Sequence, residues 1–434
     1  MKKLFSAIFA VMAMCFVSTN ATAQDRSEIL KVYNWADYID EDLLDEFEEW
    51  YFQETGKKVE VSYQLFDINE VMLTKIEIGK EDYDVVCPSD YIIERMLKKD
   101  LLLPIDRDFG STPDYTRNIS PFINGLLEEV TSGIREGRNY AIGYMWGTTG
   151  ILYNTKYVTE EEANTWGILW NPKFTDKILM KDAFHDVYCS VMLYLKQDVI
   201  KKGLMTISQV MNDYTPASIQ MFLDTISKAK SNFNGWEVDF GKERMAQEKA
   251  WVNLTWSGDA MWALDEIGEE THLAYTVPKE GSNIWFDGWV IPKYAQNVEA
   301  ARYFINFMCM PENAMRNMDY IGYVSAVATP EILESKIEED LEESIDLSYF
   351  FGPGAESVKV NSVQYPDKKT IENCAMMHDA GDRTEALMDM WSQVKGDSLS
   401  VSTVVIIVIV LGAGLFLIIK KSSKKKSKTS SKRK

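Results

Sequence analysis

Between residues 29 and 99, short apolar runs alternate with amphipathic stretches, and this alternation restricts the fold more than any other feature of the chain. In the longer stretches the apolar residues recur at helical spacing, as Leu43, Leu44 and Phe47 do on one face. Strands that alternate with helices predict an α/β fold with a parallel sheet covered on both faces. In such sheets ligands bind beyond the carboxyl ends of the strands. The expected strands are 29–33, 59–63 and 83–87, and the expected helices are 41–56, 68–78 and 92–99.

The pattern changes after residue 139. Residues 140–147 and 150–154 are two extended, glycine-punctuated segments with no helix between them, which predicts a crossing into a second domain. Helical patterns then dominate 187–230, and an aromatic-rich strand pattern follows at 251–256. A chain of 434 residues is too long for one hydrophobic core, so two lobes are expected.

Both ends of the chain carry targeting patterns. Residues 1–23 combine two early lysines, an apolar stretch and small residues before Gln24, which is typical of a secretory signal peptide. Residues 401–419 are almost entirely apolar and as a helix would span about 28 Å, enough to cross a bilayer. The tail 420–434 holds nine Lys and Arg and no acidic residue, which favours the cytoplasmic side. We therefore expect an exported body anchored in the cytoplasmic membrane by one C-terminal transmembrane helix. A cell-wall sorting signal is the alternative, but no Leu-Pro-any-Thr-Gly pentapeptide precedes the apolar run.

The exported body is strongly acidic. The whole chain has a net charge of −20, and because the tail contributes +9 and the signal peptide +2, about −31 remains. Such a surface repels nucleic acid and attracts cations. Four widely spaced cysteines in apolar surroundings predict buried thiols rather than a disulfide framework. They are Cys87, Cys189, Cys309 and Cys374.

The stretch 284–289 places the single carboxylate of Asp287 between aromatic residues, with Trp285 two positions before it. Aromatic faces and a carboxylate together suit an organic cation. The alternative is a buried strand whose Asp caps a turn. Two expected strand-to-helix loops also combine aromatics with an Asp, at 34–38 and 88–91.

Catalytic and metal-binding patterns are missing from the sequence. His185, His272 and His378 are scattered, and no His-Glu-x-x-His, Gly-x-Ser-x-Gly or phosphate-loop motif occurs. We therefore predict a protein that is not an enzyme and that uses neither a cofactor nor a metal.

Seven motifs occur in order along the chain: Tyr33–Tyr38, Tyr83–Ser89, Tyr144–Gly147, Trp166–Trp170, Val277–Gly281, Trp285–Asp287 and Ile321–Tyr323. Together they resemble the spermidine/putrescine-binding proteins of polyamine ABC importers, a family of bacterial extracytoplasmic solute-binding proteins. The resemblance extends from Leu30 to about Val394. It implies a two-lobed type II periplasmic binding protein fold with two crossover segments. One lobe would comprise 27–139 and 287–331, and the other 143–283 and 335–395.

The resemblance also implies which residues line the ligand site. Asp287 would hold one amine, Asp186 would hold the opposite amine together with Asp182, and aromatic residues would flank the methylene chain. One of the family's paired acids falls at Ala183, and a family glutamine falls at Met377, which leaves open which polyamine fits best. The full predicted set is Trp35, Tyr38, Ser89, Tyr91, Asp182, Asp186, Trp256, Trp285, Asp287 and Tyr323.

The sequence thus predicts a membrane-tethered protein that binds spermidine or putrescine between two lobes and delivers it to the permease subunits of an ABC importer. Two alternatives remain: the same fold binding another small cationic solute, and a ligand sensor that acts through a membrane partner.

Overall fold

The computed structural model describes residues 25–268 and 272–396. The predicted signal peptide 1–23, transmembrane helix 401–419 and basic tail 420–434 lie outside these residues. Within the two described ranges, no helix is both long and apolar enough to cross a membrane. The chain divides into a large unit, which includes residues up to Asp213 and Ser231–Gly381, and a small unit, which includes Tyr214–Lys230 and the chain from Asp382 onward.

The large unit is built on one mixed sheet. Its main path runs in the order β2-β1-β3-β10-β5-β8-β6-β7, and the short strands β4, β9, β11 and β12 pair with β5 or β10. The pairs β1–β2 and β1–β3 are parallel, as predicted. The pairs β6–β7 and β6–β8 are also parallel, whereas β10 is antiparallel to β3 and β5. The main-path strands are β1 (Ile29–Trp35), β2 (Glu60–Phe66), β3 (Val85–Val86), β5 (Ala141–Asn154), β6 (Ile178–Lys181), β7 (Phe233–Glu237), β8 (Val252–Trp256) and β10 (Ser282–Pro292).

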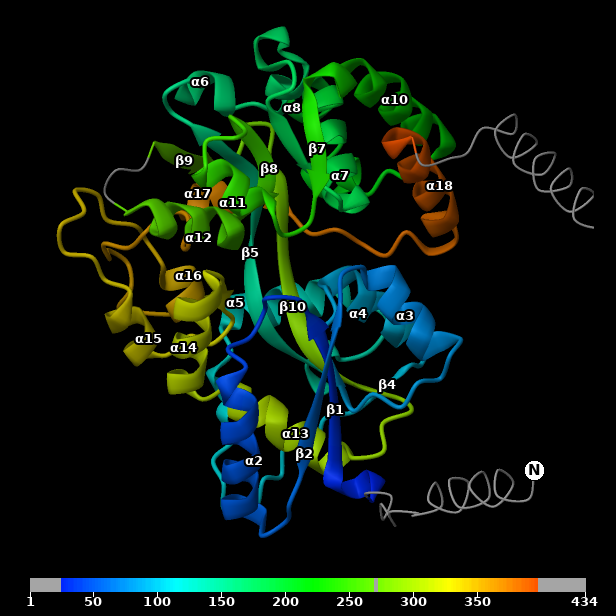
Figure 1. Cartoon of the computed structure of the whole chain (residues 1–434), viewed down its shortest axis with the longest axis vertical. Helices are drawn as coiled ribbons and strands as arrows, with labels where there is room; N and C mark the ends of the chain where they lie inside the picture. The colour runs from blue at the N-terminus through cyan, green and yellow to red at the C-terminus, as the bar shows by residue number, and fades with distance from the viewer. Residues whose placement is uncertain (1–24, 269–271, 397–434) are drawn as a thin grey trace, which may run out of the picture. The chain divides into compact units, whose positions relative to one another are not determined.

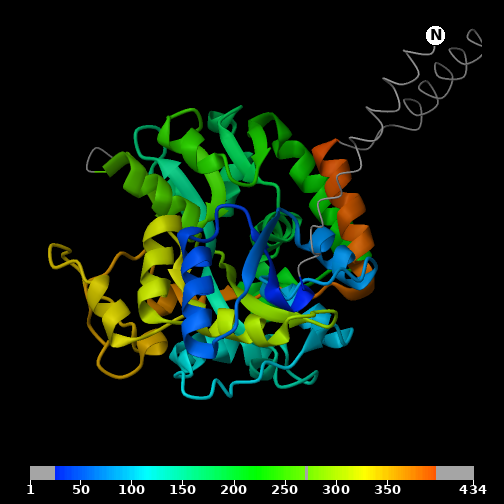
Figure 2. The same cartoon turned by 60° about the horizontal axis from the view of Figure 1, so that its bottom comes forward.

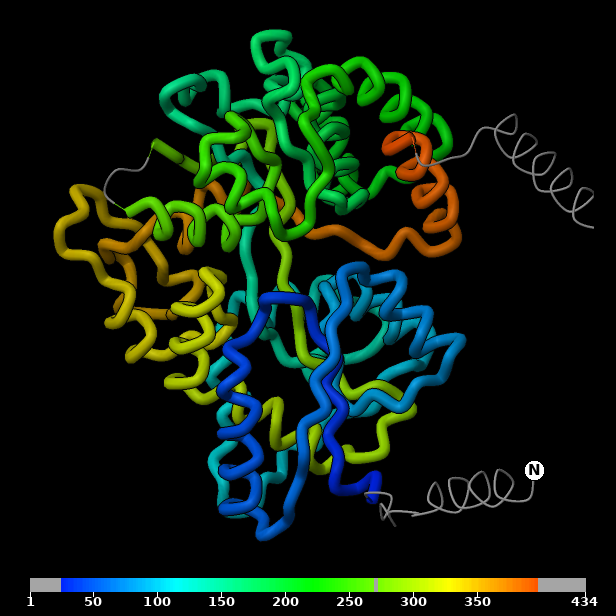
Figure 3. Tube along the Cα trace, viewed as in Figure 1, coloured from blue at the N-terminus to red at the C-terminus, as the bar shows by residue number. Residues whose placement is uncertain are grey.

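The two long strands β5 and β10 lie side by side in the middle of the sheet, as the teal and yellow-green traces in Figure 3 show. All of their residues are buried. Residues 140–154, predicted as two segments, form the single strand β5 after Tyr140. Gly147 does not interrupt this strand but permits close packing, because a Cβ there would collide with Oγ of Ser257 and lie 2.9 Å from the ring of Trp285.

The first strands are covered by helices whose apolar faces match the predicted pattern. Helix α2 (Asp42–Thr55) buries Phe47 and packs against α13 (Val298–Met308), and Figure 2 shows the blue α2 beside the yellow-green α13. The ring of Phe47 lies 5.2 Å from that of Phe304, in an edge-to-face arrangement. Helices α3 (Asn69–Glu77) and α4 (Asp90–Lys98) follow β2 and β3 (Figure 1). Segments more than 200 residues apart in sequence therefore share one core.

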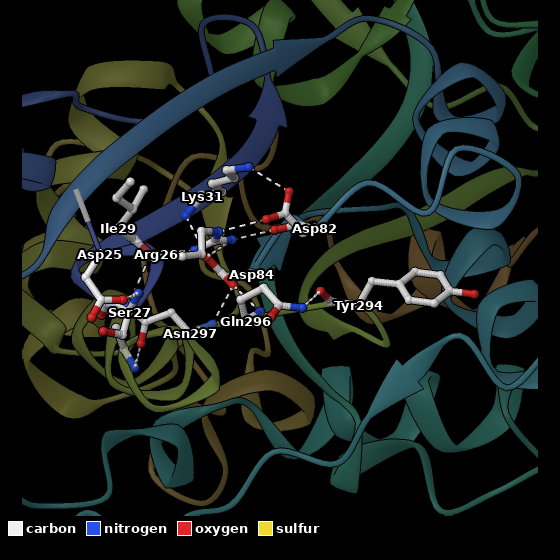
Figure 4. Close-up of polar contacts among 11 residues, drawn as sticks. Asp25, Arg26, Ser27, Ile29, Lys31, Asp82, Asp84, Tyr294, Gln296 and Asn297 are labelled. Atoms are coloured by element: carbon white, nitrogen blue, oxygen red, sulfur yellow. Dashed lines mark hydrogen bonds and ion pairs between the residues drawn. The ribbon is translucent and has the colours of Figure 1, made fainter. Parts of the chain in front are cut away.

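Asp84 connects the start of β1 to the loop before α13 (Figure 4). Its carboxylate is fully buried and accepts four hydrogen bonds. Nη2 of Arg26 and the backbone N–H of Lys31 donate to one oxygen, both at 2.9 Å, and the backbone N–H groups of Gln296 and Asn297 donate to the other, both at 2.8 Å. A buried carboxylate is stable only when it is paired in this way, so this network holds three distant segments together.

The other half of the large unit has its own core around β5, β6 and β8. Leu152, Leu179 and Met245 are among its fully buried residues. Helix α12 (Ser257–Ile267) packs on β5 and β8, and α7 (Phe184–Leu195) follows β6. The expected strand at 251–256 is thus present as β8. Cys87, Cys189 and Cys309 are buried and Cys374 is half-buried, and all four are free thiols in the described chain.

Within the small unit, α10 (Pro216–Ile226) contacts α18 (Thr384–Lys395). Helix α18 ends at Gly396, which adopts the left-handed conformation with φ of 82°.

The remaining elements of the described chain complete the fold. The other strands are β4 (Leu102–Leu103), β9 (Leu273–Thr276), β11 (Val324–Ser325) and β12 (Cys374–Ala375). The other α-helices are α5 (Pro121–Val130), α6 (Glu160–Ala163), α8 (Gln197–Lys201), α9 (Ile207–Met211), α11 (Gly241–Ala246), α14 (Pro311–Ile321), α15 (Pro330–Ser335), α16 (Ser348–Phe351) and α17 (Lys368–Glu372).

Candidate ligand-binding site

Asp287 lies in β10 where the ladder with β5 changes register, between Asp287 and Gly288. Its carboxylate accepts hydrogen bonds from the hydroxyls of Tyr38, at 2.7 Å, and Ser89, at 2.6 Å. The side chain is buried, and burial raises its pKa to about 6 although the two hydroxyls lower it; the negative charge of Asp186 raises the pKa further. The protein therefore holds a carboxylate with an elevated pKa in a rigid frame.

Aromatic rings surround this carboxylate. Tyr38 meets Tyr323 edge to face with 5.1 Å between ring centroids, and Trp285 lies 5.7 Å from Tyr323. All three rings are buried. They come from the loop after β1, from β10 and from the residue before β11, so three segments far apart in sequence bring them together.

Asp186 is a second buried carboxylate, in the first turn of α7. The hydroxyl of Thr149 in β5 donates to it at 2.8 Å, and the indole N–H of Trp256 in β8 donates at 3.2 Å. Burial raises the pKa of Asp186, while these donors and the nearby charge of Lys181 lower it.

Asp90 is the third buried carboxylate, in the first turn of α4. It accepts the backbone N–H groups of Tyr91, at 2.6 Å, and Phe286, at 3.3 Å. Burial raises its pKa well above the usual range, and the charges of Asp287 and Asp186 raise it further. The charge of Asp186 thus disfavours ionisation of Asp287, and the charges of both disfavour ionisation of Asp90. Asp90, Asp186 and Asp287 are here called the three-carboxyl cluster.

A polar network lies beside Ser89. Nδ2 of Asn69 donates to the hydroxyls of Ser89, at 3.0 Å, and Tyr91, at 3.1 Å, and Tyr91 donates to Glu70 at 3.1 Å. The Tyr91 ring also contacts the imidazole of His185, with centroids 4.4 Å apart. Burial, followed by the charge of Arg95, lowers the pKa of His185 to about 3, so this histidine is neutral at physiological pH.

A second ionic group, the Lys181 cluster, consists of Lys181, Glu237 and Asp259. Asp259 accepts a hydrogen bond from the hydroxyl of Tyr323 at 2.8 Å and forms an ion pair with Lys181 at 2.5 Å. Lys181 also pairs with Glu237 at 3.1 Å. Sequence reasoning missed this cluster; the available signals were an acidic residue three positions after Trp256 at a helix start, and a lysine that ends an apolar strand.

The chemistry of this arrangement suits an organic cation rather than a metal ion. Among residues 25–268 and 272–396, no three His, Cys, Asp or Glu side chains are grouped so that they could hold a metal. The carboxylates instead lie on separate elements, with ring faces from Trp256, Trp285 and the tyrosines near them. Such a pattern offers charge-assisted hydrogen bonds to ammonium groups and flat apolar surface between them.

Comparison with known proteins identifies the family. A model of bacterial extracellular solute-binding proteins matches residues 42–341. The chain belongs to this family. Its relatives include the spermidine/putrescine-binding periplasmic protein of Salmonella typhimurium, which is 26% identical over 396 residues that cover 91% of this chain and 99% of the relative. The putrescine-binding periplasmic protein PotF of Escherichia coli K12 is 30% identical over 355 residues, which cover 78% of this chain and 88% of the relative.

Solved structures support the same assignment. The spermidine/putrescine ABC transporter substrate-binding protein PotD of Streptococcus pneumoniae is 32% identical and superposes with a TM-score of 0.61, covering 85% of this chain and 98% of that one. This similarity confirms the predicted two-lobed α/β periplasmic binding protein fold. Membership of the solute-binding family likewise confirms that the protein is a binding component of transport rather than an enzyme.

As a member of the solute-binding family, the protein brings most of its predicted site residues into three groups. Tyr38, Ser89, Trp285 and Tyr323 surround Asp287; Trp256 contacts Asp186; Tyr91 joins the network of Glu70. The other two predicted residues, Trp35 and Asp182, make different contacts.

Trp35 is half-buried and packs on Phe66, with ring centroids 4.5 Å apart. Asp182 directly follows β6, and its backbone N–H donates to the carbonyl oxygen of Glu237 at 2.7 Å. Ala183 precedes the first residue of α7 and supplies no acid, and Met377 is a buried apolar residue. The assignment of the ten residues to a ligand remains a prediction.

Proposed function

We propose that the protein captures a polyamine, spermidine or putrescine, and delivers it to the permease subunits of an ABC importer. The observation that carries the proposal is the three-carboxyl cluster, in which the buried Asp287 is held by Tyr38 and Ser89 and is affected by the charge of Asp186. Burying several carboxylates together is unfavourable unless cations compensate them. A linear polyamine carries such charges at spaced positions.

The relatives support the choice of ligand. The protein of Salmonella typhimurium is named for spermidine and putrescine, and PotF for putrescine. Methylene segments between ammonium groups would pack on Trp256 and Trp285, whose ring faces attract cations by about 0.5–2 kcal/mol each. The polyamine would thus use both the carboxylates and the rings.

Isothermal titration calorimetry of the full-length chain in detergent micelles tests the proposal. The ligands are spermidine, putrescine, spermine and the neutral 1,4-butanediol, which has the carbon chain of putrescine without its charges. We expect one-to-one binding of at least one amine and none of the diol. Absence of heat with all three amines would mean that the cluster serves another cationic solute.

The proposed lobes are 27–139 with 287–331, and 143–283 with 335–395. Their support is that two of the three boundaries fall near β5 and β10, the two strands that pair along most of their length, while the third lies in α15. Spin labels at the exposed positions Ile78→Cys and Leu204→Cys report the distance between the lobes. We expect the distance distribution to narrow when the amine binds; an unchanged distribution would contradict ligand binding between the lobes.

We also propose that residues 401–419 anchor the protein in the cytoplasmic membrane, with the tail 420–434 in the cytoplasm. The support is compositional: an apolar run long enough to cross a bilayer precedes nine cationic residues. Such tethering would raise the effective concentration of the binding protein at the permease. Cell fractionation tests this. The full chain should sediment with membranes, and a chain ending at Gly396 should be released; equal release of both chains would contradict an anchor.

A further inference from the structure

Lys181 is a fully buried lysine at the end of β6. Its ammonium lies 2.5 Å from Oδ2 of Asp259, 3.1 Å from Oε1 of Glu237 and 2.5 Å from the carbonyl oxygen of Val238. An ammonium group has three N–H donors, so these partners engage all of its hydrogen-bonding capacity. Burial lowers the pKa of Lys181, but the two carboxylates raise it more, so the group stays charged.

The same ammonium lies over an aromatic face, 4.2 Å from the ring centroid of Trp256. Two carboxylates, a carbonyl and a ring face are the environment expected for the amine of an organic ligand. Lys181 is therefore bound by its own protein in the manner of a substrate amine.

Two residues connect this internal cation to the three-carboxyl cluster. Trp256 contacts Lys181 with its ring face and donates its indole N–H to Asp186 at 3.2 Å. Tyr323 donates to Asp259 at 2.8 Å, and its ring contacts that of Tyr38, which bonds to Asp287. Hence the Lys181 cluster is contiguous with the region where Asp287 and Asp186 would hold two ammonium groups.

We infer that Lys181 determines ligand length: its ammonium fills the position that a third ligand amine would take, so the protein selects a diamine over a triamine. This inference rests on the proposed function. A diamine places its two charges at Asp287 and Asp186. A longer triamine would bring its extra charge towards Lys181, whose ammonium already pairs with both Asp259 and Glu237 and repels a like charge.

The test compares affinities for putrescine and spermidine in the full-length chain and in Lys181→Met, which has similar side-chain length without the charge. We expect the wild-type protein to bind spermidine no more tightly than putrescine. In Lys181→Met, the affinity ratio of spermidine to putrescine should rise at least tenfold, because Asp259 and Glu237 become available to the third amine. An unchanged ratio in the variant would overturn the inference, as would a wild-type preference for spermidine of tenfold or more.

A second variant controls for misfolding, because Lys181→Met leaves two buried acids without their ion-pair partner. Lys181→Met combined with Glu237→Gln leaves only Asp259 charged, and the same rise in the ratio is expected. Lys196→Met is the matched control, since it removes another lysine that forms an ion pair, with Asp213 at 2.5 Å, in the segment after α7. A purely structural role for Lys181 would lower the melting temperature of the variants without changing the ratio.

The two proposals fail in different ways. If the wild-type protein binds neither amine, the polyamine proposal fails and the inference fails with it. If it binds putrescine and the ratio is the same in all variants, the protein remains a polyamine receptor, and Lys181 does not set ligand length.

Discussion

The hydroxyl of Tyr38 lies 2.7 Å from Oδ2 of Asp287, although 249 residues separate the two in sequence. This bond joins the loop after β1 to the middle of β10. It also lowers the pKa of Asp287, which burial raises. A single hydrogen bond thus couples the position of a loop to the charge of the carboxylate most central to the proposed site.

The substitution Asp287→Asn should weaken amine binding at least tenfold, on the order of 1.4 kcal/mol, because it removes the charge that pairs with one ammonium. Calorimetric titration measures the effect. Asp42→Asn is the control, since the side chain of Asp42 is 89% exposed and lies 3.9 Å from Arg316 on the surface. Equal affinity in Asp287→Asn and the control would remove Asp287 from the site.

The same substitution should make the ligand-free protein more stable at pH 7.5. The folded-state pKa of about 6 exceeds the ordinary value of 3.8, so Asp287 favours folding below pH 4 and loses this contribution as the pH rises through 6. At pH 7.5 the buried charge opposes folding by up to about 3 kcal/mol. A neutral asparagine at this position would avoid the penalty. Chemical denaturation should therefore give a larger free energy of unfolding for the variant than for the unchanged protein at pH 7.5, and no such gain at pH 4.

Amine affinity should decline below pH 6. An ammonium group binds the charged form of Asp287, and below its pKa of about 6 the free protein is increasingly protonated there. The affinity should fall by up to tenfold per pH unit between pH 6 and 5 and be nearly constant above pH 7. Titrations at these pH values measure the profile, and Asp287→Asn should flatten it. A flat wild-type profile would show that Asp287 is ionised throughout.

Tyr38→Phe should shift the fall in amine affinity to a higher pH. Loss of the phenolic hydrogen bond removes one of the two donors that lower the pKa of Asp287. The affinity should therefore fall more at pH 6 than at pH 8. Tyr51→Phe serves as the control, because Tyr51 is a buried tyrosine of α2 that packs on Phe47 and Tyr303, away from Asp287. A loss of affinity that is equal at both pH values would argue against the link to Asp287.

Asp84→Ala should destabilise the protein by about 3 kcal/mol or more without changing amine affinity. The substitution leaves Arg26 without one ion-pair partner and three backbone N–H groups without an acceptor. Chemical denaturation measures the loss. Arg26→Ala should cost less, because Arg26 is partly exposed. A smaller loss in Asp84→Ala than in Arg26→Ala would contradict the central role of Asp84.

Local patterns predicted the first strands and helices well, because their apolar periodicity reflects burial on one face. The expected strand 29–33 lies within β1 (Ile29–Trp35), and the expected helix 41–56 corresponds to α2 (Asp42–Thr55). The place of β10 in the sheet could not be predicted in this way. Its pairing with both β3 and β5 joins segments that are far apart in sequence, and no local spacing of residues predicts it.

In the candidate site, too, local sequence patterns predicted some residues and could not predict others. Asp287 stood out because aromatic residues flank it in sequence, whereas Asp259 and Lys181 gave only weak local signals. Lys181 meets Glu237 because the register of β6 on β7 pairs these two residues, and it meets Asp259 through the packing of α12. Such encounters depend on strand register and helix packing, which the sequence pattern alone does not specify.

The position of β10 between β3 and β5 also restricts the order of folding. Until residues 282–292 have been synthesised, β3 and β5 lack the strand that joins them, and both would expose unpaired edges. A nascent chain that ends before β10 therefore cannot complete the sheet around β1, and native pairing must wait for contacts of very long sequence separation. In an exported protein, a sheet that can be completed only after most of the chain has been made leaves time for translocation before the native sheet forms.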